Sequence, residues 1–447
     1  MGFLDETIDL LERASRQHHI VALRDGMIAS VPIILVGSTF LLLGAQGQVL
    51  QDYFSGQVAW LPNLAASGFV DWYTANTPMI LLPYRLTMGL LGMYIAFTLA
   101  SSLAKQYNLP TVPQGLGAVA ALLVSGTPVK LAVDPAQPDK LQWVLPLKPI
   151  GAEGMFLAIL LAIGMVELSR LILRPRPTDN LEESRSGIPR SVVDAFRSFL
   201  PMLTMITLVW AVVHLGGFDL QGFIVSKADF LKALGDSLGG VLAANFLLHL
   251  FQVAGVHGIS IINAVMLPIW QQFLVANADA HTAHQAMPYV TAYPFYQWFI
   301  WIGGAGATLA PTLLLFTSRN EHMRRIGRVS LVPALFNVNE PFIFGMPVVA
   351  NPILAIPCVL APLACGTVAF LAISTGMVNR PFIEVPWVMP CFLGAPLSTQ
   401  DFRGFLLLLL NLALSGAIWF PFLKAYEHRL STREEPPTPE EPGAGAD

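Results

Sequence analysis

A single carboxylate, Glu340, lies in an otherwise apolar stretch that is interrupted by proline and glycine, with Asn337 and Asn339 just before it. An ionised carboxylate in hydrocarbon costs at least ~2.5 kcal/mol, so this side chain should face a wet cavity or a partner. Pro341 cannot donate a backbone hydrogen bond and disfavours helical geometry at Glu340. A helix broken there would leave free carbonyls beside a carboxylate and two amides, which suits sugar hydroxyls. The alternative is a structural ion pair with a nearby arginine.

A second candidate is His257, which lies between Gly255 and Gly258 at the end of a long apolar segment. The glycines let the backbone turn and expose the ring, and a neutral imidazole can donate from one nitrogen and accept at the other. His257 could therefore bind a hydroxyl, or help to activate one that attacks a phosphoryl group. A lone histidine is more often a satisfied core residue, and His249 is expected to be one of these.

Two further residues could contribute to binding. Trp387 follows Glu384 in a proline-rich apolar segment, and its ring could stack on a sugar or anchor at the membrane interface. Arg85 is an unusual charge in an apolar segment, and it could point into the site, pair with a carboxylate or extend toward lipid headgroups.

We predict no metal site and no cofactor. The pair His281 and His284 has loose ligand spacing and no carboxylate or cysteine to complete a set. The cysteines Cys358, Cys365 and Cys391 are expected to be small buried hydrophobic residues.

The composition indicates what kind of elements position these residues. Of the 447 residues, 54% are hydrophobic and only 12% charged, and the mean hydropathy is +0.59, as in an integral membrane protein. The net charge of −4 gives no sign of nucleic-acid binding. No P-loop is present, which excludes ATP-driven pumping by this chain alone.

We predict an all-α polytopic membrane protein of about ten transmembrane helices, some of them broken or re-entrant. Apolar windows suggest crossings at 27–44, 78–103, 112–125, 151–173, 196–215, 238–254, 295–316, 353–373 and 404–423. Segments 258–274, 331–349 and 381–397 are apolar but interrupted by Pro, Gly or polar residues. Interrupted segments occur at membrane depth only when they are packed in protein or line a wet cavity, as in the binding sites of transporters.

Positive charge predicts the orientation. Arginines precede the first window and fill the connections after 173 and 316, whereas the loops 45–77 and 275–293 contain no Lys or Arg. Both termini should therefore be cytoplasmic. The predicted divisions are an amphipathic segment (1–25), a membrane bundle (26–174), an Arg-rich connection (175–195), a membrane region with the site (196–430) and a disordered acidic tail (431–447).

Four stretches carry a family resemblance: NVNEPFIFGMPVVANP (337–352), IGRVSLVPALFN (326–337), GVHG (255–258) and EVPWVMP (384–390). They resemble the enzyme IIC component of the lactose/cellobiose (diacetylchitobiose) family of phosphotransferase permeases, and the similarity spans most of the chain. The sequence departs from the family pattern at Ile259 and at Arg85, which leaves the particular sugar open.

The resemblance implies a homodimer of ten-span subunits in a bacterial inner membrane. An N-terminal bundle would form the interface, and a C-terminal domain would hold a β-linked disaccharide. It places His257 and Glu340 on the sugar. It also implies that the sugar is phosphorylated during transport by a phosphorylated cysteine on a separate enzyme IIB. Enzyme IIB would receive its phosphoryl group from the histidine-containing carrier protein through enzyme IIA. No IIA or IIB domain is expected in this chain. An ion-coupled transporter, with Glu340 as the coupling group, and a sugar-binding sensor or scaffold are the competing hypotheses.

Overall fold

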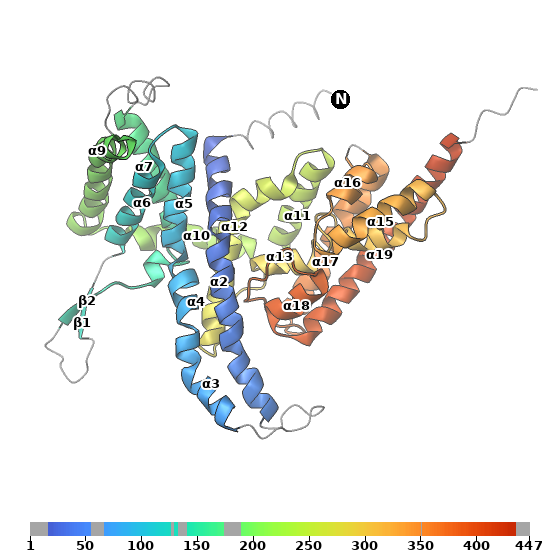
Figure 1. Cartoon of the computed structure of the whole chain (residues 1–447), viewed down its shortest axis with the longest axis horizontal. Coiled ribbons are helices and arrows are strands. Elements are labelled where there is room, and N and C mark those ends of the chain that lie inside the picture. Colours follow the sequence, from blue (N-terminus) through green and yellow to red (C-terminus); the bar gives the residue numbers. More distant parts are fainter. Residues whose placement is uncertain are drawn as a thin grey trace, which may run out of the picture.

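The structure is a computed structural model that describes residues 17–54, 67–126, 129–132, 141–173, 189–349 and 351–434. The predicted segments 1–25 and 175–195 are described only in part, and the tail 431–447 lies outside the described residues except for its first four. Helices make up most of the described chain, as predicted (Figure 1).

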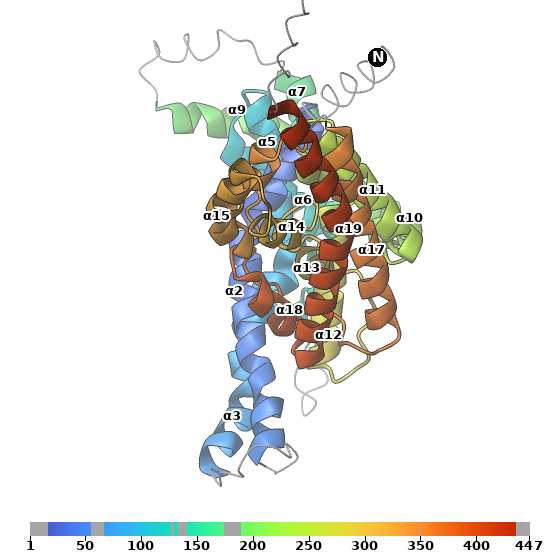
Figure 2. The same ribbon diagram turned by 90° about the vertical axis from the view of Figure 1, so that its right-hand side faces the viewer.

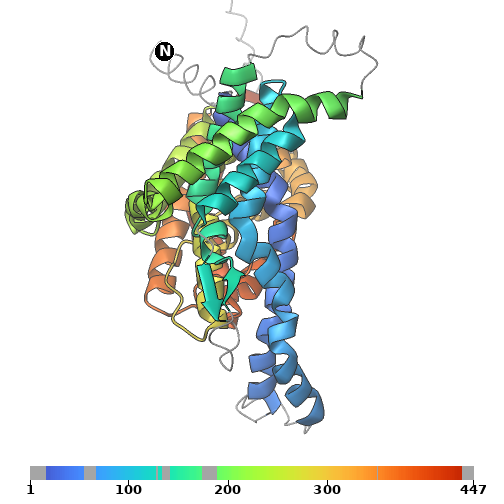
Figure 3. The ribbon, with the colours of Figure 1, turned by 90° about the vertical axis from the view of Figure 1, so that its left-hand side faces the viewer.

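The first half of the chain forms a helical bundle. Its helices are α2 (His18–Phe54), α3 (Ser67–Ile80), α4 (Leu82–Thr87), α5 (Leu91–Gln106), α6 (Thr111–Ser125), α7 (Met155–Leu173) and α9 (Arg190–Trp210). Helix α5 packs against α2, α6 and α7, while α9 lies obliquely across α6 and α7 (Figure 3). A Cβ added at Gly26 of α2 would lie 2.7 Å from the Leu99 Cα of α5. Small residues therefore let these apolar helices approach closely, which is how helices associate where lipid tails compete for apolar surface.

The second half alternates long and short helices. They are α10 (Leu220–Gly235), α11 (Leu238–Val253), α12 (Gly258–Thr282), α13 (Tyr293–Phe299), α14 (Leu309–Leu315), α15 (Glu321–Leu335), α16 (Glu340–Gly345), α17 (Pro352–Ser374), α18 (Cys391–Thr399) and α19 (Phe402–Glu434). The long α17 packs against α11 and α19, and the short α13, α14 and α18 lie beside them (Figure 2).

Seven helices are long and apolar enough to cross a membrane within the described ranges, or eight if the bent pair α10 and α11 is one span. That pair bends by 79°. The sequence predicted about ten crossings. Part of the difference lies in window 295–316, which the structure divides into α13, a loop and α14.

Two of the three predicted interruptions are confirmed. Segment 331–349 contains the end of α15 and the short α16, and segment 381–397 contains a loop followed by α18. The third prediction is wrong, because 258–274 lies in the continuous helix α12 despite Pro268. Proline is tolerated inside membrane helices when neighbouring groups satisfy the freed carbonyl.

One small β element was not predicted. Strands β1 (Val129–Ala132) and β2 (Leu141–Val144) pair antiparallel, with Val129 opposite Val144, and the pair projects from the bundle (Figure 1). The start of α2 and the last turns of α19 lie at the same end of the molecule (Figure 1).

The predicted boundaries between domains remain a prediction.

Candidate functional site

The junction between α15 and α16 contains Glu340. Helix α15 ends at Leu335, and Asn337 has a φ of 61°, in the left-handed region. Glu340 is itself the first residue of α16, so the expected break lies just before it rather than at it. The physical reason is that proline is tolerated in the first turn of a helix, where its missing N–H would have no intrahelical partner, so Pro341 starts α16.

Glu340 is exposed, while Asn337 and Asn339 are half-buried. No cation pairs with Glu340 in the described part of the chain. The described residues therefore do not contain the structural ion pair that was the alternative for Glu340. An exposed carboxylate with free lone pairs can accept hydrogen bonds from a ligand's hydroxyl groups.

Asn337 joins three segments of the chain. The Gly303 N–H donates to its Oδ1 at 3.0 Å, and its Nδ2 donates to the carbonyl of Trp387 at 3.0 Å. Asn339 adds a bond from Nδ2 to the carbonyl of Ala305 at 2.6 Å. The two amides predicted to bind substrate thus hold the α13–α14 loop and the Trp387 loop beside Glu340.

The α13–α14 loop is a feature that sequence reasoning missed. Gly303, Gly304 and Gly306 have φ angles of 82°, 106° and 94°, which other residues rarely adopt. A Cβ at Gly304 would lie 2.6 Å from the Cγ of Asn339, so only glycine permits this approach. The signal in the sequence is the run of glycines inside an apolar window.

His257 is the N-cap of α12 and is exposed. Its Nδ1 accepts from the backbone N–H of Ser260 at 3.4 Å and lies 2.9 Å from the Ser260 hydroxyl oxygen. Because a backbone N–H only donates, Nδ1 is the accepting nitrogen, and the neutral ring carries its proton on Nε2. The other ring nitrogen of His257, Nε2, is therefore a donor.

His249 shows the contrasting case. It is fully buried, its Nδ1 donates to the Asn245 carbonyl at 2.7 Å, and its Nε2 accepts from the Gly306 N–H at 2.9 Å. The prediction that His249 is a satisfied core histidine is confirmed.

Close packing positions the His257 turn. Gly255 has a φ of 88°, and a Cβ there would lie 3.2 Å from the Cγ1 of Val349, in the segment after α16. A Cβ at Gly258 would lie 1.9 Å from the Leu248 carbonyl oxygen. The glycines that flank His257 thus let its turn pack against α11 and beside the segment that follows α16.

The Trp387 loop presents one exposed and one buried side chain. Trp387 is 53% exposed, whereas Glu384 is 7% exposed and its Oε2 has no hydrogen-bond partner. The backbone N–H of Glu384 donates to the Ser38 Oγ of α2 at 3.1 Å. Exposure of Trp387 fits both predicted roles, a ring that stacks on a sugar and an anchor at the membrane interface. Glu384 lies where this loop meets the first bundle.

The structure places Arg85 far from His257. Arg85 is exposed on α4, and its neighbour Tyr84 donates its hydroxyl to Asp279 at 2.7 Å, near the end of α12. His257 lies at the opposite end of α12, and 21 residues of helix rise by about 32 Å. An arginine side chain cannot span that distance.

Two other predictions concern the cysteines and possible metal ligands. The three cysteines are free and buried, as predicted. Over the ranges that the structure describes, no three His, Cys, Asp or Glu side chains are grouped to hold a metal ion.

Comparison with known proteins identifies the family. The family model described as "Phosphotransferase system, EIIC" matches residues 24–362. The chain belongs to the EIIC family. It is a multi-pass membrane protein of a sugar phosphotransferase system.

The relatives include a putative permease IIC component, YwbA, of Bacillus subtilis (strain 168), which is 34% identical over 94% of this chain and 93% of that protein. The lichenan permease IIC component of the same organism is 31% identical over 96% of this chain and 94% of that protein. Among solved structures, ChbC, the IIC component of the N,N'-diacetylchitobiose-specific phosphotransferase system, matches with a TM-score of 0.82 and 26% identity. That match covers 97% of this chain and all of the other.

Proposed function

We propose that this EIIC protein imports a β-linked disaccharide and that a separate enzyme IIB phosphorylates the sugar during transport. Relatives named as specific for lichenan, cellobiose and oligo-β-mannoside support the substrate class, because they match at least 96% of this chain. These sugars share β-linked rings that carry many hydroxyl groups and an apolar face.

The observation that carries the proposal is the junction at Asn337. The side-chain amide of Asn337 holds the α13–α14 loop and the Trp387 loop beside exposed Glu340. Glu340 accepts bonds from hydroxyls, and the exposed Trp387 ring covers an apolar ring face. His257 donates from Nε2 to a sugar oxygen. Asn337 and Asn339 act as positioning residues, because their side-chain amides already form hydrogen bonds to the two loops.

Transport requires the site to reach both sides of the membrane, and we propose that the C-terminal domain moves against a fixed dimer of N-terminal bundles. Among the described residues, hydrogen bonds between the two parts include Ser38 with the Glu384 N–H, Tyr84 with Asp279, and the Gln272 Nε2 with the Ala152 carbonyl at 2.9 Å. Each contributes about 1 kcal/mol net. Apolar side chains of α2, such as Ile34 and Leu41, share a buried core with α12, so the proposed movement must also rearrange this apolar contact.

The orientation completes the proposal. We place both termini in the cytoplasm, because the arginine-rich connections and the end of α19 then lie on the side where enzyme IIB is found. Sugar released there meets its phosphoryl donor.

Equilibrium binding of radiolabelled disaccharides to the purified protein tests the site. Glu340→Gln removes a charge and an acceptor while keeping the size of the side chain. We expect the affinity for cellobiose or another β-linked disaccharide to fall at least tenfold, about 1.4 kcal/mol. Glu153→Gln removes an exposed carboxylate before α7 and should bind as the unmodified protein does. Equal affinities for all three proteins would contradict the assignment of Glu340.

A further inference from the structure

Arginine side chains are concentrated at the turn between α14 and α15. Arg319 lies in the turn itself, and Arg324, Arg325 and Arg328 follow on the first turns of α15. Arg319, Arg325 and Arg328 are exposed. An exposed group of like charges raises the local concentration of oppositely charged partners and speeds their association.

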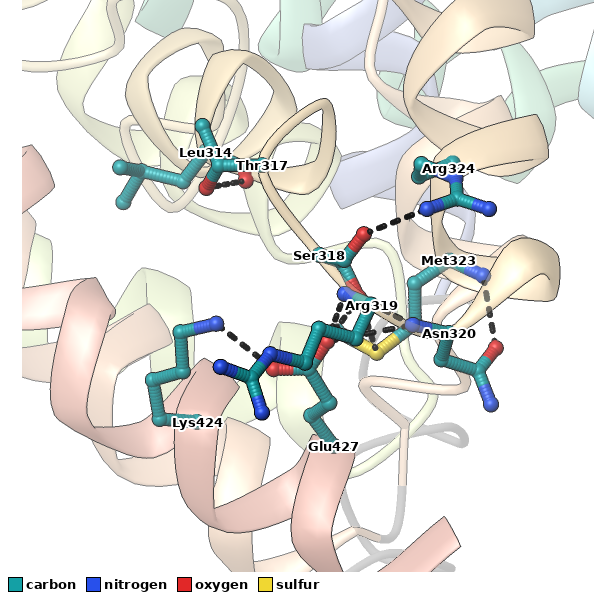
Figure 4. Close-up of polar contacts among 9 residues, drawn as sticks. All are labelled: Leu314, Thr317, Ser318, Arg319, Asn320, Met323, Arg324, Lys424 and Glu427. Carbon is teal, nitrogen blue, oxygen red and sulfur yellow. Dashed lines mark hydrogen bonds and ion pairs between the residues drawn. The ribbon is translucent and has the colours of Figure 1, made fainter. Parts of the chain in front are cut away.

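The turn is fixed to the rest of the protein by Glu427 of α19 (Figure 4). Glu427 Oε1 accepts hydrogen bonds from the Ser318 hydroxyl and from the backbone N–H groups of Arg319 and Asn320. Lys424 Nζ pairs with the other carboxylate oxygen at 2.7 Å. The turn therefore keeps its backbone position without help from the Arg319 side chain.

Two more contacts order the start of α15. The Met323 N–H donates to Asn320 Oδ1 at 3.2 Å, which caps the helix, and Arg324 Nη1 donates to the Ser318 carbonyl at 3.2 Å. Arg324 is therefore engaged within the turn, and the exposed arginines project from an ordered base.

The exposed arginines differ in their partners. Arg325 pairs with Glu321 at 2.6 Å, and its hydrogen bond and charge hold the pKa of Glu321 below the usual value. Arg319 and Arg328 have no acidic partner among the residues that the structure describes. In Figure 4 the Arg319 side chain extends from the turn, and no contact joins its guanidinium to another residue drawn. These two guanidinium groups remain free to bind an anionic group.

Helix α15 connects this surface to the candidate sugar site. From Arg328 to the end of α15 at Leu335 the helix rises by about 10 Å, and Asn337 follows two residues later. A partner held at Arg319 and Arg328 would therefore sit at a fixed distance from the Asn337 junction and Glu340. A lipid headgroup would gain nothing from that fixed relation, whereas a phosphoryl donor requires it.

We propose that Arg319 and Arg328 form the docking surface for phosphorylated enzyme IIB. This inference rests on the proposed function. Guanidinium groups bind carboxylates through two parallel hydrogen bonds, so these arginines suit acidic side chains on the surface of enzyme IIB, while its phosphocysteine reaches the sugar site. In the reaction, the S–P bond of the phosphocysteine breaks and an O–P bond forms to a sugar hydroxyl. The hydroxyl proton is released, and the cysteine leaves as a thiolate.

The test measures phosphorylation of saturating sugar at varied concentrations of purified phospho-enzyme IIB, with the permease in nanodiscs of zwitterionic lipid. The variant carries Arg319→Gln and Arg328→Gln together. We expect its KM for phospho-enzyme IIB to rise about tenfold, with kcat changed little and with a weaker dependence on salt, because surface charges act mainly on association. The control, Arg325→Gln, removes the paired arginine of the same helix and should change KM less than threefold.

Three results would overturn the proposal. An unchanged KM in the double variant would show that enzyme IIB docks elsewhere. A change that occurs only in nanodiscs of anionic lipid would assign the arginines to lipid headgroups. Absence of phosphorylation by the unmodified protein would remove the proposed function and the docking surface together. Equilibrium sugar binding by each variant, expected to be unchanged, shows that the site is intact.

Discussion

At the scale of single residues, His257 shows how a neighbour decides what an imidazole can do. Two groups of Ser260 lie against Nδ1, one of them a backbone N–H that can only donate. The neutral ring is then a hydrogen-bond donor at Nε2, so it suits binding of a sugar oxygen better than removal of a proton from one. The sequence predicted an exposed ring but left its role open between binding and activation.

A pair of substitutions tests this role. In His257→Gln the side-chain NH₂ group can occupy the position of Nε2, whereas in His257→Asn it lies near Nδ1. We expect the Gln variant to bind the disaccharide within about threefold of the unmodified protein and the Asn variant about tenfold more weakly, because it lacks the donor. Asparagine is the better helix N-cap, so a weaker Asn variant cannot be explained by loss of the α12 cap.

Rates of sugar phosphorylation add a second readout for the same pair. If His257 only donates, the Gln variant should phosphorylate saturating sugar at nearly the normal rate. A fall of ~10²–10⁴ in that rate would instead indicate acid–base assistance and would contradict the assignment of the proton to Nε2.

Other residues show where sequence reasoning ends. Glu340 could be predicted because a lone carboxylate in an apolar segment needs an explanation. Asn337 was predicted as a ligand of the substrate, yet its Oδ1 and Nδ2 bond two distant segments, and no pattern in one sequence reveals such partners. Arg85 was placed at the site because it is charged and intramembrane. Its position depends on how α4 packs against the far end of α12, which only the tertiary structure contains.

At the scale of elements, prolines and glycines do not mark breaks equally well. Pro341 and the prolines that precede α18 coincide with real interruptions, but Pro268 and Pro396 lie inside the helices α12 and α18. The interruption in 295–316 is made by glycines with positive φ, and the apolar composition of that window concealed it. Hydropathy reports how long and how apolar a segment is. Whether the helix breaks there also depends on which neighbouring groups form hydrogen bonds with its freed backbone groups.

The close approach of the α13–α14 loop to Asn339 can be tested with an alanine substitution. Gly304→Ala places a Cβ 2.6 Å from the Cγ of Asn339 and also forces a left-handed φ on alanine. Gly376→Ala is the matched control, because Gly376 has a φ of 77° but no atom within 4 Å of the added Cβ. The strain at positive φ costs about 1–3 kcal/mol in either variant.

We expect the Gly304 variant to have a lower Tm than the Gly376 variant and to bind sugar more weakly, because its collision displaces the loop that Asn339 holds. The Gly376 variant should lose stability but keep its sugar affinity. Equal sugar affinity in the two variants would show that this loop does not shape the site.

At the scale of the whole molecule, orientation is the least direct prediction. Charge asymmetry between loops indicates it, and the shared end of α2 and α19 agrees with termini on one side (Figure 1). The three native cysteines are buried, so an introduced cysteine will dominate labelling by a membrane-impermeant thiol reagent. Ala286 lies beyond the end of α12, and Ser431 lies near the end of α19; both are exposed.

In intact cells we expect Ala286→Cys to label readily and Ser431→Cys to label only after the membrane is permeabilised. The reverse pattern would place the arginine-rich surface outside the cell and would remove it from any contact with enzyme IIB. Labelling of both in intact cells would require the ends of α12 and α19 to lie on the same side.

The measurement that tests the central proposal most directly is uptake of tritiated disaccharide into vesicles that contain this protein, with and without phosphorylated enzyme IIB on the cytoplasmic side. We predict that accumulated label is sugar phosphate, that its accumulation requires the phosphorylated partner, and that a proton uncoupler leaves it unchanged. Accumulation of unmodified sugar that needs no enzyme IIB and stops when the uncoupler is added would contradict the proposal and would indicate an ion-coupled transporter.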